Sequence, residues 1–211
     1  WGKYYNKINY SNSAFILKSE IINSWIAEIK PKTLIDIGGN DGTFVRRINY
    51  KIEETLVCDI DNNAVDYNYK TLKINKEQFM LPFVLDVLNP SAAIGLNNKE
   101  RFSFLDRIKE YAPDVTLALA VIHHMTLSGN VPFDKSAQFF SSFSKYLIIE
   151  FPKREDSWVK RLLNNKAEFK EHFDFYNLEA FEIAYSKYFE IIENKAIDGS
   201  ERVMYLLKNK C

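Results

Sequence analysis

The chain has 211 residues, of which 46% are apolar, and its 28 lysine and arginine residues balance 28 aspartate and glutamate residues. This apolar content excludes a disordered chain, and the neutral charge excludes a protein drawn to nucleic acid or to an anionic membrane by its overall field. Two cysteines, Cys58 and Cys211, give neither a disulfide framework nor a metal-ligand spacing. We therefore expect a cytoplasmic protein, and no apolar run approaches the roughly 20 residues that cross a bilayer.

The first predicted element is a helix between residues 12 and 30. Its apolar residues recur close to helical period, Asn12 or Ser13 would cap it, and Pro31 would stop it. With the tyrosine-rich residues before it, this helix forms a predicted N-terminal cap or lid of residues 1–30, ahead of one globular domain of residues 31–211. The sequence begins at Trp1 and not at Met, which suggests a domain excised from a longer chain.

Seven short apolar segments after this helix predict strands. The first five end in polar or turn residues: Thr33–Ile37, Thr55–Ile60, Phe83–Val87, Val115–Ile122 and Tyr146–Phe151. Helical patterns alternate with strands, as at residues 133–143, and this alternation predicts parallel βαβ units. After a helix over residues 178–188, Phe189–Glu193 and Val203–Leu207 flank an Asp-Gly turn. The predicted fold is α/β: a Rossmann-like, doubly wound, seven-stranded mixed sheet with a C-terminal antiparallel hairpin.

A cluster of glycines follows the first predicted strand, in the segment TLIDIGGNDGTFVRRI of residues 33–48. Glycines between a strand and a helix allow a tight turn and let a ligand approach the main chain. A dinucleotide loop needs the spacing G-x-G-x-x-G, but counting from Gly38 the later glycine places hold Asn40 and Thr43. No lysine follows Gly42, so the loop also lacks the pattern of nucleoside triphosphate hydrolases.

Polar side chains end the next predicted strands. Asp59 lies 21 positions beyond Gly38, where a carboxylate can hydrogen-bond both hydroxyls of a ribose, and Asp86 ends the strand after it. Two histidines, His123 and His124, end the fourth strand. Because the carboxyl ends of parallel strands meet at one edge of a sheet, these groups are predicted to share one ligand cleft.

These segments together resemble the class I S-adenosylmethionine-dependent methyltransferases, from about Thr33 to Phe151. The stretches DVLNPSAAIG, ALAVIHHM and YLIIEFPK are also similar to a bacterial subgroup of nodulation-protein-related methyltransferases. The resemblance implies S-adenosylmethionine as cofactor and S-adenosylhomocysteine as product. It implies that the cofactor is bound by Asp36, Gly38, Gly39, Asn40 and Gly42 in the loop, by Asp59, Ile60, Asp86 and Val87 at ribose and adenine, and by Ala118, Leu119 and Ala120 beneath the sulfonium. Asn40 stands where this family often has glycine.

Three residues at the predicted acceptor end are candidates for catalysis: His123, His124 and Glu150. Either histidine could be a general base, since imidazole titrates near neutrality, or could simply pack or hydrogen-bond within the fold. Glu150 could touch substrate or bind a loop amide. Adjacent histidines point different ways, and no third ligand has a recognisable spacing, so we predict no metal. Tyr4, Tyr5 and Tyr10 are candidates for a lid over the sulfonium or for ordinary packing.

The predicted function is methyl transfer from S-adenosylmethionine to an oxygen or nitrogen of an unidentified small molecule, saccharide or protein. A non-catalytic cofactor-binding or scaffolding module and a nicotinamide-dependent oxidoreductase are the alternatives, and the glycine spacing disfavours the second. Nucleic acid is a disfavoured acceptor, because the chain lacks the interleaving of aromatic and basic residues that stacks bases. Basic residues such as Lys153 and Arg154 could face an acidic acceptor, although a solvated surface is the more ordinary interpretation.

Overall fold

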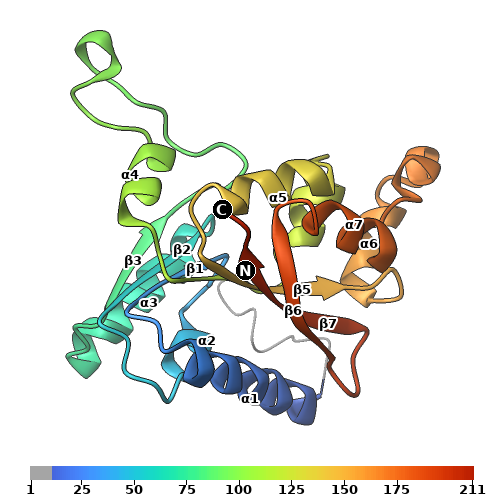
Figure 1. The fold of residues 1–211 in the computed structure, drawn as a ribbon, viewed down its shortest axis with the longest axis horizontal. Coiled ribbons are helices and arrows are strands. Elements are labelled where there is room, and N and C mark those ends of the chain that lie inside the picture. The colour runs from blue at the N-terminus through green and yellow to red at the C-terminus, as the bar shows by residue number, and fades with distance from the viewer. Residues whose placement is uncertain (1–10) are drawn as a thin grey trace.

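The computed structural model describes residues 11–211, and these form one mixed sheet with helices on both faces (Figure 1). The strands lie in the order β3-β2-β1-β4-β5-β7-β6. Their bounds are Thr33–Ile37 (β1), Glu54–Asp59 (β2), Met80–Val84 (β3), Val115–Ala118 (β4), Tyr146–Pro152 (β5), Phe189–Ala196 (β6) and Arg202–Asn209 (β7). The first five run parallel, and β7 pairs antiparallel with both β5 and β6. The predicted doubly wound sheet and C-terminal hairpin are thereby confirmed.

The helices divide between the two faces of the sheet. Their bounds are Asn12–Ile29 (α1), Thr43–Arg46 (α2), Asn62–Asn75 (α3), Phe104–Tyr111 (α4), Phe133–Ser141 (α5), Ser157–Asn164 (α6) and Leu178–Tyr185 (α7). Shorter turns are the 3-10 helices η2 (Leu96–Asn98) and η4 (Ala167–Phe173) and the π-helical turn η3 (His124–Ser128). Figure 1 shows α1 along one face and α5, α6 and α7 on the other.

The side chains of each strand point alternately to the two faces of the sheet, and the protein has one hydrophobic core on each face. In β5, Leu147 and Ile149 join the core under α5 and α7, whereas Ile148 between them joins the core under α1. Successive side chains of a strand point to opposite faces, so a strand that is apolar at every position is buried on both sides. This is why the segment that predicts β5 has apolar residues at successive positions, with Glu150 as its one charged residue.

Helix α1 begins and ends at recognisable caps. The hydroxyl of Ser11 accepts a hydrogen bond from the backbone N–H of Ala14 at 3.2 Å, so the cap lies one residue before the predicted Asn12 or Ser13. Lys30 ends the helix in the left-handed conformation, with φ of 54°, directly before Pro31. Tyr4, Tyr5 and Tyr10, the candidates for a lid or for ordinary packing, lie outside the described residues.

Two predicted strands extend too far toward the C-terminus, and the last two strands, β6 and β7, are longer than predicted. Strand β3 spans Met80–Val84 and not residues 83–87, and β4 ends at Ala118 and not at Ile122. In both places the apolar residues beyond the true strand end line a cavity or pack in a turn, as Leu85 and Leu119 do. Periodicity cannot distinguish such residues from a buried strand.

Candidate functional site

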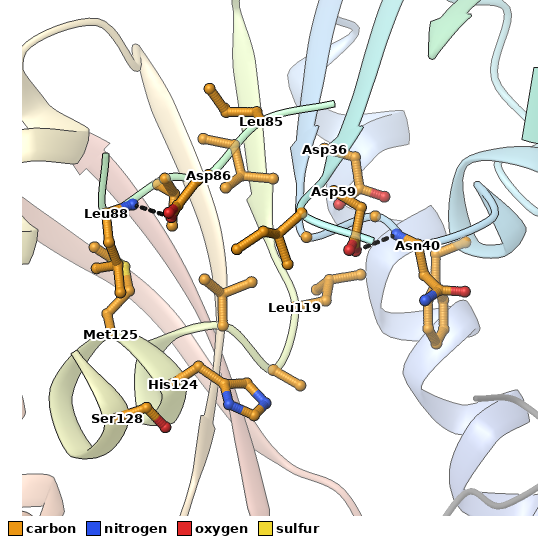
Figure 2. A pocket seen from close by; sticks show the side chains of 18 of the residues that line it. Asp36, Asn40, Asp59, Leu85, Asp86, Leu88, Leu119, His124, Met125 and Ser128 are labelled. Atoms are coloured by element: carbon orange, nitrogen blue, oxygen red, sulfur yellow. Dashed lines mark hydrogen bonds between the residues drawn. The ribbon is translucent and has the colours of Figure 1, made fainter. Parts of the chain in front are cut away.

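A cavity of about 300 Å³ lies at the carboxyl ends of the parallel strands, where the strand order reverses between β1 and β4 (Figure 2). This is the position at which open α/β sheets bind ligands, and the volume is at the lower end of the range for ligand pockets, about 300–1,000 Å³. The cavity is lined by ten of the residues predicted to bind cofactor: Asp36, Gly38, Gly39, Asn40, Asp59, Ile60, Asp86, Val87, Leu119 and Ala120. Gly42 and Ala118 do not line it, and Ala118 is fully buried.

The glycine loop leaves β1 in a tight turn that is fastened to β2. The backbone N–H groups of Gly38 and Gly39 donate to the carbonyl of Cys58 at 2.9 and 3.0 Å. A methyl group on Gly39 would lie 2.6 Å from the Oδ2 atom of Asp36, so only glycine fits beside that carboxyl. The helix after the loop, α2, has only four residues and therefore offers one turn of N–H groups.

Asn40 occupies the loop position at which related loops often have glycine. Its φ of 49° is left-handed, a conformation that asparagine adopts more readily than other residues with a side chain. Its backbone N–H donates to Oδ2 of Asp59 at 3.0 Å. The departure from the family pattern therefore preserves the shape of the loop.

Asp59 ends β2 and joins the loop to the start of α3. Besides the bond from Asn40, its Oδ1 atom accepts the N–H of Asp61 at 2.8 Å. Burial raises the pKa of Asp59, and these two hydrogen bonds act in the opposite direction. A carboxylate has about four acceptor sites, so two occupied sites leave capacity for a ligand diol on the cavity side.

Asp86 lies on the other side of the cavity from Asp59 in Figure 2. It lies two residues beyond the end of β3, and its Oδ1 atom accepts the N–H of Leu88 at 2.9 Å. The predicted convergence of strand ends is therefore present, although a short connection and not the strand itself carries Asp86.

Asp36 is the most deeply buried acid of the cavity wall, with 1% of its surface exposed. Burial raises its pKa to about 7, and nearby Lys18 acts against this rise while Asp59 adds to it. Its Oδ1 atom has no hydrogen-bond partner among the described residues. A buried, unsatisfied carboxyl oxygen is costly, and a ligand that donates a hydrogen bond or carries positive charge would satisfy it.

The two predicted histidines have different surroundings. His124 begins the π-helical turn and lines the cavity with Met125 and Ser128, whereas His123 is buried and lies outside the lining (Figure 2). Burial lowers the pKa of both imidazoles, and the charge of Arg202 contributes to the shift of His124. A neutral imidazole that faces a cavity is competent as a general base, and His124 is the one so placed.

Glu150 does not line the cavity. It is fully buried behind two basic residues that do, and it binds Lys18 Nζ at 2.7 Å and Arg202 Nη1 at 3.3 Å. Arg202 also donates from Nε to Asp156 Oδ2 at 2.9 Å. Burial alone would raise the pKa of Glu150, but Lys18 and Arg202 outweigh it and hold the pKa below its usual value. Glu150 therefore positions cations in the wall.

Lys18 and Arg202 also line the cavity, although neither is among the site residues predicted from sequence. Lys18 lies on the buried face of α1, among apolar residues such as Ile22, and Arg202 begins β7. A lysine on the apolar face of a predicted helix is the one signal that could have indicated a buried partner, because lysine is almost never fully buried unless it is paired.

The residues present fit an adenosyl sulfonium compound. The wall combines a bare loop, carboxylates at the ends of β1 and β2, and an unsatisfied buried carboxyl oxygen that suits a cationic or hydrogen-bond-donating group. Within residues 11–211, no group of three or more histidine, cysteine, aspartate or glutamate side chains is placed to hold a metal ion. Across the same residues, no helix is both long and apolar enough to span a membrane.

The family model of the spermine/spermidine synthase domain matches residues 15–147, which is more than half of the chain. The chain belongs to this family. Among curated members and relatives, nodulation protein NoeA of Rhizobium meliloti (strain 1021) is 31% identical over 206 residues, which cover 97% of this chain and 42% of that protein. The chain thus spans about two fifths of that relative. A polyamine aminopropyltransferase of Leptospira biflexa is 30% identical over 77 residues, covering 36% of this chain and 27% of that protein.

Solved structures place this spermine/spermidine synthase family member in the methyltransferase fold. The N-methyltransferase NodS from Bradyrhizobium japonicum has a TM-score of 0.64 at 10% identity, covering 94% of this chain and 98% of that one. Magnesium protoporphyrin IX methyltransferase from Synechocystis, with bound S-adenosylhomocysteine, has a TM-score of 0.60 at 10% identity, covering 93% and 84%. The predicted resemblance to class I methyltransferases is confirmed for the fold, and the curated relative NoeA confirms the likeness to nodulation-related bacterial proteins.

Proposed function

We propose that the protein binds S-adenosylmethionine in this cavity and transfers its methyl group to an oxygen or nitrogen of an acceptor. The observation that carries the proposal is the meeting of the glycine loop, Asp36 and Asp59 in one cavity at the point where the strand order reverses. When bound, S-adenosylmethionine supplies a methyl group that its positive sulfur already activates for in-line displacement, with S-adenosylhomocysteine as product.

Each wall of the cavity has a proposed task in holding the cofactor. Asp59 accepts hydrogen bonds from the ribose hydroxyls, and the residues after β3, Asp86 and Val87, meet the adenine with Ile60. Gly38, Gly39 and Asp36 lie next to the methionine part, where the unsatisfied oxygen of Asp36 receives its cationic or N–H groups. This assignment gives a partner to the unsatisfied oxygen of Asp36 and uses the remaining acceptor sites of Asp59.

The acceptor enters over β4 and the π-helical turn. The chief task of the protein there is alignment, because holding two reacting groups in line can contribute about 7–11 kcal/mol as effective concentration. His124 lines this part of the cavity and takes the proton of the attacking group. Ala120, in the turn after β4, lies beneath the sulfonium. Residues 1–30 serve as the cap of a domain formed by residues 31–211.

Aminopropyl transfer is the second candidate, and the family match favours it. A relative is named a polyamine aminopropyltransferase, and the decarboxylated form of S-adenosylmethionine carries an aminopropyl group on the same sulfur. The two donors differ by one carboxylate, so they provide a direct comparison. A non-catalytic cofactor-binding module is the third candidate, and it predicts binding without turnover.

Calorimetry with S-adenosylmethionine, its decarboxylated form, S-adenosylhomocysteine and NAD separates these functions. We expect binding of S-adenosylmethionine and S-adenosylhomocysteine, weaker binding of the decarboxylated form, and no heat with NAD. Preference for the decarboxylated form, together with loss of its aminopropyl group to a polyamine, would favour the second candidate. Binding of NAD alone would overturn the proposed function.

A further inference from the structure

The cavity is acidic at one end and basic at the other. The carboxyl groups of its lining, Asp36, Asp59 and Asp86, come from β1, from the end of β2 and from the segment that follows β3, whereas Arg202 begins β7. Between β2 and β7 lie β1, β4 and β5, so these two strands are four spacings apart, or roughly 19 Å at about 4.8 Å per strand. Arg202 therefore lies at the acceptor end, beyond the part of the cavity assigned to the adenosyl group.

Two cations line this end, and their partner carboxylates lie behind them. Lys18 and Arg202 face the cavity, while Glu150 and Asp156 hold them from positions outside the lining. Arginine keeps its charge under all ordinary conditions, and its rigid fork suits carboxylate and phosphate groups. Although the four charges sum to zero, a ligand in the cavity meets the cations first.

Neighbouring groups do not reverse this polarity. His124 lies close enough to Arg202 for that charge, together with burial, to lower its pKa, so the neutral form of the imidazole is favoured. Asp36 and Lys18 are close enough for each charge to act on the pKa of the other: burial raises the pKa of Asp36 to about 7 and lowers that of Lys18, and Glu150 acts against the lowering. Residues 1–10, which the structure does not describe, contain no aspartate or glutamate in their sequence.

We propose that the Lys18–Arg202 end of the cavity receives an anionic group, a carboxylate or a phosphate, of the methyl acceptor and excludes polycationic acceptors. This inference rests on the proposed function and gives it a substrate class. A guanidinium and an ammonium in a low-dielectric wall bind an anion through charge-assisted hydrogen bonds and repel an amine cation. The basic residues suggested by sequence for this role, Lys153 and Arg154, instead pair with Glu201 and Asp174 outside the cavity.

The test first measures S-adenosylhomocysteine binding alone and then adds small ions to the protein saturated with it. Inorganic phosphate and acetate represent the two anionic groups, and spermidine represents a polycation. We expect phosphate or acetate to bind the saturated protein in the millimolar range, as followed by NMR shifts of His124 and Ser128, and we expect spermidine to cause no such shifts. The two anions distinguish a phosphate-bearing from a carboxylate-bearing acceptor.

Arg202→Gln is the deciding variant, and Arg154→Gln is its matched control, because Arg154 has an acidic partner but does not line the cavity. We expect Arg202→Gln to weaken anion binding by about tenfold or more, since it removes a buried charge partner. The affinity of the Arg202→Gln variant for S-adenosylhomocysteine should stay within about twofold of that of the unaltered protein, because Arg202 lies beyond the proposed position of the adenosyl group. Arg154→Gln should change neither.

Two further variants guard against loss of folding. Lys18→Met removes one cation and leaves Arg202 paired, and Arg202→Gln combined with Asp156→Asn removes one charge of each sign. Either variant should weaken anion binding if it folds, as its S-adenosylhomocysteine binding would report. Equal anion affinity in the Arg202 and Arg154 variants would overturn the inference.

The outcomes also separate this inference from the proposed function. Absence of S-adenosylhomocysteine binding to the unaltered protein would overturn the proposed function and the inference with it. Binding of S-adenosylhomocysteine without binding of either anion, or with binding of spermidine, would overturn only the inference. Anion binding that S-adenosylhomocysteine abolishes would also overturn it, because the cations would then serve the carboxylate of the cofactor.

Discussion

Asp59 holds the backbone of the candidate site and also faces the ligand. Its two oxygens accept N–H groups from Asn40 and Asp61, and the same carboxylate lines the cavity. We expect Asp59→Ala to lower S-adenosylhomocysteine affinity by about 10- to 100-fold, because hydrogen bonds to a charged group contribute about 1.5–3 kcal/mol each. Calorimetry on the purified variant measures this. Asp66→Asn, an exposed acid on α3 outside the cavity, is the control and should leave affinity unchanged.

His124 is predicted to titrate below the usual histidine range. Burial and the charge of Arg202 both lower its pKa, so the imidazole stays neutral as the pH falls through 6.5 and gains its proton only at lower pH. An NMR titration assigned with His124→Gln measures the midpoint. In Arg202→Gln the midpoint should rise toward 6.5, whereas Arg154→Gln should leave it in place. A midpoint above 6.5 in the unaltered protein would contradict the described environment.

At the scale of single residues, sequence indicated the acids more reliably than the bases. Asp36 and Asp59 lie in the last two positions of apolar strands, and the geometry of a parallel sheet takes such residues to one edge. Lys18 and Glu150 are 132 residues apart, and Arg202 and Glu150 are 52 apart, so no local pattern links them. His123 and His124 are consecutive and their ring centroids are 4.1 Å apart, yet only His124 lines the cavity, a difference that the fold alone reveals.

Among the elements, α1 is fastened to the sheet by a buried ion pair as well as by apolar packing. Lys18 on α1 binds Glu150 on β5, which also binds Arg202 on β7, so one carboxylate links three elements. We expect Glu150→Gln to lower the free energy of unfolding by about 3–5 kcal/mol, because it leaves buried cations without their counter-charge. Urea denaturation followed by circular dichroism measures the change.

The control for this prediction is Glu190→Gln, an exposed glutamate on β6, which should change the free energy of unfolding by no more than about 0.5 kcal/mol. Equal stability of the two variants would show that the buried pair contributes nothing net. A catalytic role for Glu150 would instead leave stability intact and abolish methyl transfer alone. The two readouts thus distinguish a positioning residue from a catalytic one.

Element boundaries were predictable where a strand is bounded by polar residues and uncertain where apolar residues continue past it. Strand β1 matches its prediction at both ends, because Lys32 precedes it and glycines follow. Strand β4 does not, because Leu119 and Ile122 are apolar for reasons of cavity lining and turn packing. A left-handed Ala120, with φ of 55°, is what ends the strand, and no sequence rule predicts an alanine there.

The carboxyl edge of the sheet brings the acids of the cavity lining to one side and Arg202, which is paired with Glu150 and Asp156, to the other. The parallel order of β1 to β4 gathers the acids, and the antiparallel insertion of β7 beside β5 adds Arg202 to the same edge. Sequence predicted the hairpin but not that Arg202, the first residue of β7, would line the cavity. The C-terminal hairpin therefore contributes to the site as well as completing the sheet.

The buried carboxyl of Asp36 makes the stability of the ligand-free protein depend on pH. Burial raises the pKa of Asp36 from 3.8 to about 7, so between these values the folded protein keeps a proton that the unfolded chain has lost, and stability falls as the pH rises through this window. Asparagine at position 36 cannot titrate, so Asp36→Asn does not lose this stability. We expect the difference in the free energy of unfolding, variant minus unaltered protein, to rise by roughly 2 kcal/mol from pH 5 to pH 8. Thermal and urea unfolding at both pH values measure the gain, and the control is Asp66→Asn, which removes an exposed carboxyl outside the cavity. A difference that does not change with pH would mean that Asp36 is already ionised in the folded molecule, and the buried carboxyl would then have found a partner without any ligand.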